Sequence, residues 1–284
     1  MADHSDAAPG RNRRGRAKAE SLLRIGTAGW SIDRRCADEL PAPGSHLERY
    51  ARRLKAVEIN TSFRRKHQPR TYERWARSVP DDFRFSVKLP QAITHERALT
   101  GCGELVKSFA DETAGLGAKM AIWLVQLPPK LAFDAKTFDR FFDLVDLCSR
   151  AMVAIEPRHA SWFTGKVERK LVERRIARVA ADPAKVPGAR EPGGWDRLAY
   201  FRWHGSPRMY YSAYDQEALS SLGRRLDDSR HRGAATWCIF DNTAASAALR
   251  NALSLEASRD TNRPGTGRSS APEHDHETSA RLGD

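Results

Sequence analysis

The sequence predicts a single α/β domain of the TIM-like (β/α)8 barrel type. Eight short apolar runs recur along the chain, and stretches with apolar residues at helical spacing separate most of them. Within several runs, polar residues alternate with the apolar ones. Strands that alternate with helices pair in parallel, and eight such units close into a barrel. The chain has 284 residues, which is enough for one domain of this kind.

The predicted strands are short, apolar and partly β-branched. In chain order they span residues 23–30, 56–60, 83–90, 121–129, 152–157, 175–182, 198–205 and 235–242. Between them, apolar residues that recur every three or four positions predict helices over 47–54, 138–145 and 219–226. The last predicted helix follows the eighth strand and is rich in Ala and Leu, with Asn242 or Thr243 as its N-cap.

One unit departs from this layout. Between the sixth and seventh predicted strands, the stretch "PAKVPGAREPGGW" contains three prolines and three glycines. Proline removes a backbone donor and clashes with the preceding turn, which excludes a regular helix. We therefore expect a Pro/Gly-rich loop in place of the sixth helix. The alternative is a strand count that is off by one.

Composition divides the chain into three parts. Residues 1–20 carry a basic excess and almost no large apolar side chains, and residues 257–284 are rich in Ser, Thr, Gly, Pro, Asp and Arg. Such segments bury too little apolar surface to offset the entropy of ordering. We expect a disordered basic N-terminal tail over 1–20, a single barrel domain over 21–256, and a disordered C-terminal tail over 257–284.

The balance of charge favours anionic partners. The chain holds 48 Lys and Arg against 36 Asp and Glu, a net charge of +12. Such a surface suits phosphate-bearing ligands or nucleic acid, and plain solubility is the alternative explanation. The four scattered cysteines include no C-x-x-C pair, which argues against a disulfide framework or a structural zinc site. No signal peptide and no membrane span is apparent, so we expect a cytoplasmic protein without a membrane partner.

Alternation within the strands predicts where the polar side chains point. In a barrel the apolar face meets the surrounding helices, so the polar face must point inward. The inner set near the C-terminal mouth is then Glu58, Lys88, Glu156, Arg202 and His204, with Ser86 and Tyr200 on the same face. Other strands also end in polar or aromatic residues: Trp30, Asn60, Gln126, Asp182, Asp241 and Asn242. Unpaired charges there would cost several kcal/mol each, so they should pair with one another or await a ligand.

Several of these strand ends belong to longer motifs. They include "GTAGWS" (26–31), "VEINTSF" (57–63), "FSVKLPQAITH" (85–95), "IEPRHASW" (155–162), "HGSPRMYYSAY" (204–214) and "IFDNTAASAALRNAL" (239–253). Together they resemble the YecE-like TIM barrels, also called domain of unknown function 72. The resemblance runs from the first strand to the last helix and implies a TIM-barrel-like fold without an established activity. Arg64 stands where members of that family usually carry Tyr, so a stack on a ligand would in this chain be replaced by a charge.

Candidate chemistry follows from the residues at the mouth. Glu156 and Glu58 could act as general acid and base, or as a nucleophile pair in glycoside-type hydrolysis. His159 and Asp241 join them as catalytic candidates. Guanidinium and ammonium groups recognise phosphate or carboxylate. The last helix would add backbone donors at its N-terminus, near 241–246. The candidate substrate-binding residues are Lys88, Arg158, Arg202, His204, Trp30, Asn60, Gln126, Asp182, Asn242 and Tyr211. A purely internal salt-bridge network is the alternative.

Cofactor expectations are limited. A divalent metal is an open alternative, since imidazole and carboxylate groups could gather at the strand ends. Its candidate ligands are His95, His159, His204, Asp182, Asp241 and Glu156, although no H-x-H or H-E-x-x-H spacing is present. No P-loop occurs, and no G-x-G-x-x-G follows a strand, so no nucleotide cofactor is expected.

The functional hypothesis is an enzyme, a hydrolase, lyase or isomerase, that acts on a small anionic or sugar-like substrate at the C-terminal mouth. Two alternatives stay open. One is a nucleic-acid-binding protein or nuclease, suggested by the net charge and by the basic run over 64–77, in which aromatic residues are interleaved. That run also fits a solvated helix with Tyr72 and Trp75 turned inward. The other is a ligand-binding barrel without turnover, because a fold does not determine a function.

Overall fold

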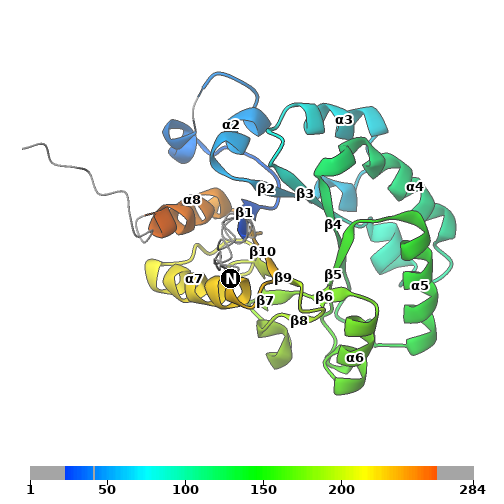
Figure 1. Ribbon diagram of the computed structural model, residues 1–284. Coiled ribbons are helices and arrows are strands. Elements are labelled where there is room, and N and C mark those ends of the chain that lie inside the picture. Colours follow the sequence, from blue (N-terminus) through cyan, green and yellow to red (C-terminus); the bar gives the residue numbers. More distant parts are fainter. Residues whose placement is uncertain (1–22, 41, 261–284) are drawn as a thin grey trace, which may run out of the picture.

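Two curved sheets of mainly parallel strands occupy the centre of the fold, and the helices lie along their outer side (Figure 1). The computed structural model describes residues 23–40 and 42–260. The tail expected over 1–20 lies outside the described residues, as does 261–284 of the C-terminal tail. Residues 257–260, which composition assigns to that tail, instead form the last turn of a helix.

The strands divide into a four-stranded and a six-stranded sheet. The first has the order β1-β10-β9-β7, and the second has the order β2-β3-β4-β5-β6-β8. All neighbouring strands are parallel except β6 and β8, which form a short antiparallel pair. The bounds are β1 Leu23–Thr27, β2 Ala56–Ile59, β3 Arg84–Lys88, β4 Met120–Gln126, β5 Met152–Glu156, β6 Ile176–Arg178, β7 Ala180–Asp182, β8 Gly193–Gly194, β9 Leu198–Trp203 and β10 Ala235–Phe240. The α/β class and the parallel pairing are as predicted, but the strands do not form one continuous closed ladder.

The predicted sixth strand is split between the sheets. Its first part, β6, pairs with β5, and its second part, β7, pairs with β9. Val179 stands between them, and its amide still donates to the carbonyl oxygen of Ile155 at 2.9 Å. One run of chain therefore contributes a strand to each sheet.

The two sheets also approach each other between β1 and β2. Ala28 and Glu58 form a parallel bridge there, and the amide of Gly29 donates to the Glu58 carbonyl at 2.8 Å. The buried hydroxyl of Tyr50 accepts from the Thr27 amide and donates to the Ala56 carbonyl, both at 2.9 Å. This seam is a single bridge with a side-chain link, and it is not a full ladder.

Seven α-helices within the described residues cover the sheets. They are α2 His46–Arg53, α3 Pro69–Arg77, α4 Gly103–Thr113, α5 Ala135–Cys148, α6 Gly165–Glu173, α7 Gln216–His231 and α8 Ala247–Asp260. Ser45 forms a capping box with Glu48 at the start of α2, and Asp134, Thr164 and Asp215 cap α5, α6 and α7. Short helical turns at the strand ends include η2 Thr61–Phe63, η3 Ala92–Glu96 and η5 Ala160–Trp162. None of the helices in the part of the chain that the structure describes combines the length and apolarity needed to cross a bilayer.

Three local predictions can be compared with the structure. Over 183–197, all of which is described, a 3-10 turn and β8 stand in place of an α-helix, as predicted. The basic run over 64–77 contains α3, with Tyr72 buried and Trp75 half-buried, which matches the solvated-helix interpretation. The start of the last helix was predicted wrongly. α8 begins at Ala247 because 243–246 form a turn in which Ser246 adopts a positive φ of 59°.

The hydrophobic core has two separate parts. The larger part lies between the sheets and the helices and contains the predicted helical faces, such as Leu47 and Phe138. The smaller part gathers inward-facing strand residues from both sheets and is called the inner cluster. It consists of Ala56, Ile122, Leu124, Ala154, Ala177, Val179, Leu198, Tyr200, Trp237 and Ile239. Alternation therefore places Ala154 in the inner cluster and, two residues on, Glu156 at the strand end above it.

Candidate functional site

Arg202 is the centre of the polar group at the strand ends. It comes from β9, and its side chain is fully buried. Its Nε and Nη2 donate to the two carboxylate oxygens of Glu58 at 3.0 and 2.7 Å. Its Nη1 donates to Glu156 at 2.5 Å, and its Nη2 also donates to Asp241 at 2.9 Å. One guanidinium thus joins carboxylates from β2, β5 and the end of β10.

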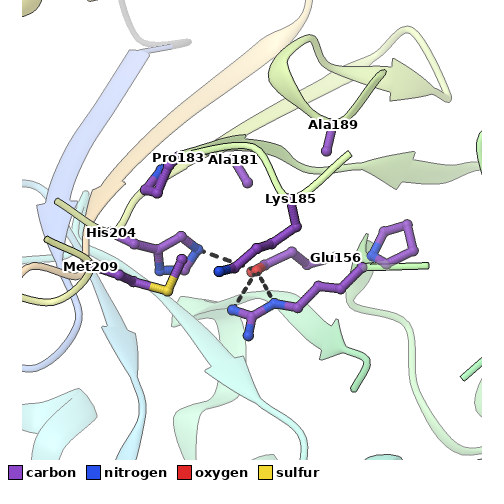
Figure 2. A pocket seen from close by; sticks show the side chains of 9 residues that line it. Glu156, Ala181, Pro183, Lys185, Ala189, His204 and Met209 are labelled. Atoms are coloured by element: carbon purple, nitrogen blue, oxygen red, sulfur yellow. Dashed lines mark hydrogen bonds and ion pairs between the residues drawn. The ribbon is translucent and has the colours of Figure 1, made fainter. Parts of the chain in front are cut away.

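Glu156 is the second centre. Its Oε1 accepts from Nε and Nη2 of Arg158 at 3.1 and 2.9 Å. The amide of Gln126, at the end of β4, donates to both of its oxygens at 3.0 and 3.1 Å. His204 Nε2 lies 3.2 Å from Oε1, and Figure 2 shows these two side chains directed toward each other. The carboxylate therefore accepts from four donor residues at the ends of three strands, β4, β5 and β9.

Asp241 closes the group. His204 Nδ1 lies 3.0 Å from its Oδ2, so the imidazole bridges Asp241 and Glu156. Asn60 donates to its Oδ1 at 3.3 Å. We call this connected set the ion network. Its members are Glu58, Asn60, Gln126, Glu156, Arg158, Arg202, His204 and Asp241.

A neutral chain of hydrogen bonds ties the ion network to the inner cluster. The hydroxyl of Tyr200 donates to Glu58 Oε2 at 2.9 Å and lies 2.7 Å from the hydroxyl of Ser86. The Tyr200 ring stacks on Trp237, with 6.0 Å between centroids and 15° between planes. The packing below therefore fixes the position of the Glu58 carboxylate.

The network sets the protonation of its members. Burial disfavours the Glu156 carboxylate, but Arg202, His204 and Arg158 together hold its pKa well below the usual value. Burial likewise opposes ionisation of Asp241, while Arg202 and His204 lower its pKa. For His204 the two effects have the opposite signs: burial lowers its pKa, and the nearby Glu156 and Asp241 raise it above the ordinary value. The arrangement thus favours two carboxylates bridged by an imidazolium.

Acid should remove part of this stabilisation. Because the folded state lowers the pKa of Glu156, its carboxylate stabilises the fold above the unfolded pKa of about 4.3, and this contribution is lost as the pH falls through the folded pKa. We expect the difference in free energy of unfolding between wild type and Glu156→Gln to be largest above about pH 5 and to shrink toward about pH 3. Urea unfolding at a series of pH values measures it. The exposed Glu173→Gln should change the free energy of unfolding only slightly, and a pH-independent difference for Glu156→Gln would contradict the expectation.

Lys88 lies beside the ion network without joining it. It ends β3 and is 7 % exposed. Its ammonium lies 4.2 Å from the centroid of the Phe63 ring, and the His95 ring meets Phe63 edge-on at 5.0 Å. Among the hydrogen bonds and ion pairs of the described residues, none involves Lys88 Nζ. Burial first, and then the charge of Arg202, lower the pKa of Lys88 to about 8 against the opposing pull of Glu58, Asp241 and Glu156.

Two cavities border the ion network. The smaller one is about 10 Å³, room for about one water molecule. It is shown in Figure 2 and is lined by Glu156, Arg158, Lys185, His204 and Met209 among others. The larger one is about 570 Å³, within the range of small-molecule sites, and it meets the network at Asn60. Its walls include Trp30, Asp33, His46, Arg65, His67, Trp75 and Leu249.

The structure brings most of the predicted site residues together. Glu58, Lys88, Glu156, Arg202 and His204 meet as alternation predicts, and Asn60, Gln126, Arg158 and Asp241 join them. Arg202, predicted to bind substrate, is fully buried. It donates four hydrogen bonds to carboxylates and so orients them.

Other predicted residues serve local structure instead. His159 accepts from the Ser161 amide and caps η5. The carboxylate of Asp182 accepts from the Tyr214 hydroxyl at 2.8 Å. Asn242 is buried and donates to Ser212 and Asn251. Tyr211 is exposed and lies under the guanidinium of Arg208. Trp30 is different, because it lines the larger cavity and meets Trp75 edge-on at 5.0 Å.

The candidate metal ligands are not gathered in one place. His95 bonds Thr94, and His159 and Asp182 have the local partners just described. Across residues 23–40 and 42–260, no three His, Cys, Asp or Glu side chains form a group that could hold a metal ion. His204, Asp241 and Glu156 are adjacent, but Arg202 lies among them.

Several residues of the site were not predicted as functional. Alternation predicts that Ser86 and Tyr200 lie on the inner face. The sequence does not show, however, that the Tyr200 hydroxyl bonds a carboxylate. Phe63 belongs to a predicted motif, but its contact with Lys88 depends on the helical turn η2. The cavity walls His46, Arg65 and Leu249 come from α2, the loop after η2, and α8, so only the folded chain reveals them.

Comparison with known proteins gives consistent results. The model of a family described as "Protein of unknown function DUF72" matches residues 24–276. The UPF0759 protein YecE of Escherichia coli (strain K12) is 33% identical over 150 residues, which cover 51% of this chain and 54% of that protein. The chain thus matches about half the length of that relative. The UPF0759 protein YunF of Bacillus subtilis (strain 168) is 28% identical over 264 residues, which cover 81% of this chain and 92% of that protein.

Solved structures agree in fold. A DUF72 family protein from Thermotoga maritima superposes with a TM-score of 0.72 at 25% identity, covering 84% of this chain and 99% of that one. A DUF72 family protein from Enterococcus faecalis gives a TM-score of 0.71 at 19% identity, covering 92% and 99%. The second likeness concerns the fold alone.

Proposed function

The chain belongs to the DUF72 family of proteins of unknown function, and we propose that it is an enzyme acting on a small anionic or sugar-like substrate at the strand-end site. The ion network is the observation that carries the proposal. It sets three carboxylates, two guanidinium groups and an imidazole side by side at the carboxyl ends of the strands. Burying charges costs several kcal/mol for each ion, and well-packed apolar residues often stabilise a core at least as well. Clusters of ionisable groups with shifted pKa values are common at functional sites.

We also infer that the two sheets form one eight-stranded barrel. The seam at Ala28 and Glu58 supports this on one side, and the shared segment 176–182 supports it on the other. The inner cluster supports it as well, because it combines residues of both sheets, such as Ile122 and Trp237. In barrels of this kind the active site lies at the carboxyl ends of the strands, which is also where the ion network lies.

The charges that face outward favour an anion as substrate. The Arg158 side chain is 14 % exposed and Lys88 is 7 % exposed, whereas the carboxylates of Glu58 and Glu156 are buried beneath them. Lys185 lines the small cavity on the same side. Guanidinium and ammonium groups bind carboxylate or phosphate groups by charge-assisted hydrogen bonds. A substrate that enters the mouth therefore meets cations first.

The charged residues of the site have distinct roles in this proposal. Arg158 binds the anionic group. Glu156 and Asp241 remain ionised near neutral pH, so they position cations and stabilise positive charge rather than act as general acids. Arg202 holds the carboxylates in register. The larger cavity, with Trp30 on its wall, would take the rest of a sugar-like molecule.

The proposed activity can be tested with a panel of small phosphorylated, carboxylated and sugar-like metabolites. We expect at least one to be converted by the wild type, and about 100-fold or more slowly by Glu156→Gln, a loss typical of a site from which a preorganised electrostatic group is removed. Glu173→Gln, an exposed change on α6, should keep full activity. Turnover that persists in both Glu156→Gln and Glu58→Gln would show that the carboxylates of the ion network are not needed for catalysis.

A second function, nucleic-acid binding, rests on a different surface. Arg70, Arg74 and Arg77 of α3 are exposed, next to Arg64 and Arg65. Arginine side chains in such a group can contact successive phosphates. Electrophoretic mobility shifts over a salt series test it. Binding weaker than millimolar at low salt, or binding without a salt slope, would exclude it.

We further infer that the protein works in the cytoplasm. Its four cysteines are free thiols, and Cys36, Cys102 and Cys238 are buried. Unpaired cysteines persist in reducing compartments, where disulfides are rare. Cell fractionation followed by detection of the protein would test this location.

A further inference from the structure

Lys88 differs from the two arginines of the ion network because, among the described residues, no carboxylate holds it. Glu58 and Asp241 bond Arg202, and Glu156 bonds both Arg202 and Arg158. These pairs use the carboxylates that would otherwise fix a lysine as an ammonium ion. Within the described residues, the ring of Phe63 is the contact that orients the amine, and a ring face accepts no proton.

The surroundings of Lys88 also suit a nucleophile. Burial and the positive charge of Arg202 favour the neutral amine, and the pKa near 8 leaves a substantial neutral fraction at physiological pH. Desolvated lysines next to another cation are activated in this way for attack on carbonyl carbon. The charged groups that act on it come from four places: Glu58 of β2, Glu156 of β5, Arg202 of β9 and Asp241 after β10, and Lys88 in turn lowers the pKa of His95 on η3.

We propose that Lys88 forms a Schiff base with a small aldehyde or ketone that carries a carboxylate or phosphate group. This inference rests on the proposed function and names its substrate class and its nucleophile. Arg158 lies close enough for its charge, like that of Lys88, to act on His95, and it would bind the anionic group while the amine meets the carbonyl carbon. The Phe63 ring would keep the amine in place for attack.

The covalent step balances without a further reactant. The lone pair of the neutral Lys88 amine forms a carbon–nitrogen bond, and the carbonyl π electrons move to oxygen, which takes a proton. The resulting carbinolamine loses that oxygen as water, with a second proton, while the nitrogen gives up its remaining protons. One carbonyl and one amine become one imine and one water, and nothing is oxidised or reduced. His95, whose ring meets the Phe63 ring that Lys88 also contacts, would relay these protons as a neutral base, because burial and then the charges of Lys88, Arg158 and Arg64 lower its pKa.

Reductive trapping tests the proposal on the full chain. The protein is incubated at about pH 7.5 with sodium cyanoborohydride and either pyruvate or dihydroxyacetone phosphate, and the modified lysines are located by peptide mass spectrometry. We expect Lys88 to be modified at least about ten-fold faster than exposed lysines, because far more of its amine is neutral than for an ordinary lysine. The two probes distinguish a carboxylate-bearing from a phosphate-bearing substrate.

Two variants serve as matched controls. Lys88→Arg keeps the charge and should lose the fast modification while other lysines react as before. Lys130→Arg changes an exposed lysine that follows β4 on the same rim and should leave the modification of Lys88 unchanged. Modification spread evenly over exposed lysines in the wild type, with no excess at Lys88 for either probe, would overturn the proposal without relying on any variant.

Failure of this inference can be separated from failure of the proposed function. Turnover of a panel metabolite that persists in Lys88→Arg would overturn Lys88 as the nucleophile and leave the enzyme in place. Fast, selective trapping of Lys88 in a protein that converts no metabolite of the panel would support Lys88 as a reactive lysine and contradict the proposed enzymatic activity.

Discussion

Replacing Arg202 with Met is expected to lower the free energy of unfolding by about 3–5 kcal/mol. The substitution removes the guanidinium that pairs Glu58, Glu156 and Asp241. Three carboxylates would then lie close together, and each of them would lose its main counter-charge. Breaking a buried ion pair on one side leaves an uncompensated buried charge, which is costlier than removing both partners. Urea unfolding followed by circular dichroism measures the loss.

A second substitution distinguishes two causes of the stability loss in Arg202→Met: unpaired charges and lost packing. Glu58→Gln in the Arg202→Met background removes one unpaired charge and should recover part of the lost stability. Arg77→Met is the control, because this arginine is largely exposed and pairs with Glu73 at only 3.9 Å. Its effect should stay within about 0.5 kcal/mol. An Arg202→Met loss as small as this, or a double variant less stable than Arg202→Met alone, would contradict an ionic origin.

Trp237→Ala is expected to cost about 3–5 kcal/mol, the usual range for removing a buried aromatic side chain. Trp237 is 1 % exposed and lies in the inner cluster. Its loss leaves a cavity, and the surrounding strands, which belong to two sheets, cannot easily move inward to fill it. It also frees the Tyr200 ring, whose hydroxyl donates to Glu58. The substitution should therefore lower stability and loosen the ion network above it.

The same unfolding assay provides the comparison. Leu147 is 84 % exposed on α5, and Leu147→Ala should change the free energy of unfolding by no more than about 0.5 kcal/mol. A loss for Trp237→Ala below about 1 kcal/mol would mean that the inner cluster is not a packed core.

Much of the site could be predicted because strand geometry is regular. Side chains two residues apart share a face, and parallel strands bring their carboxyl ends to one edge. These two rules suffice to bring Lys88, Glu156, Arg202 and His204 together from distant parts of the sequence. They depend only on where each apolar run lies, which the chain shows clearly.

The rest depends on three-dimensional detail that a single sequence does not contain. Alternation cannot tell which carboxylate a guanidinium will select, so it could not separate the paired Arg202 from the unpaired Lys88. Beyond the strand ends it fails, because loops turn side chains away: Asp182 meets Tyr214, and Asn242 meets Asn251. The positive φ of Ser246, which delays the start of α8, likewise carries no sequence signal, since serine is not a residue that favours it.

The division into two sheets was not predicted for a related reason. Residues 175–182 form one apolar run, and nothing in its composition shows that its two halves pair with different strands. Pairing is decided by the twist of the neighbours and by contacts far away in sequence. The family resemblance indicated the correct family but could not supply this local detail.

The pKa of Lys88 tests most directly whether the carboxylates at the mouth pair with arginine and histidine and leave Lys88 without a carboxylate partner. It can be measured by following the side-chain 13Cε shift of Lys88 in a heteronuclear NMR titration, with Lys88→Arg to assign the signal. Paired carboxylates and a buried amine lead us to expect a midpoint of about 8. A midpoint at or above the ordinary lysine value of 10.5 would show that a carboxylate pairs with the Lys88 ammonium. That result would contradict an ion network whose carboxylates pair only with other residues.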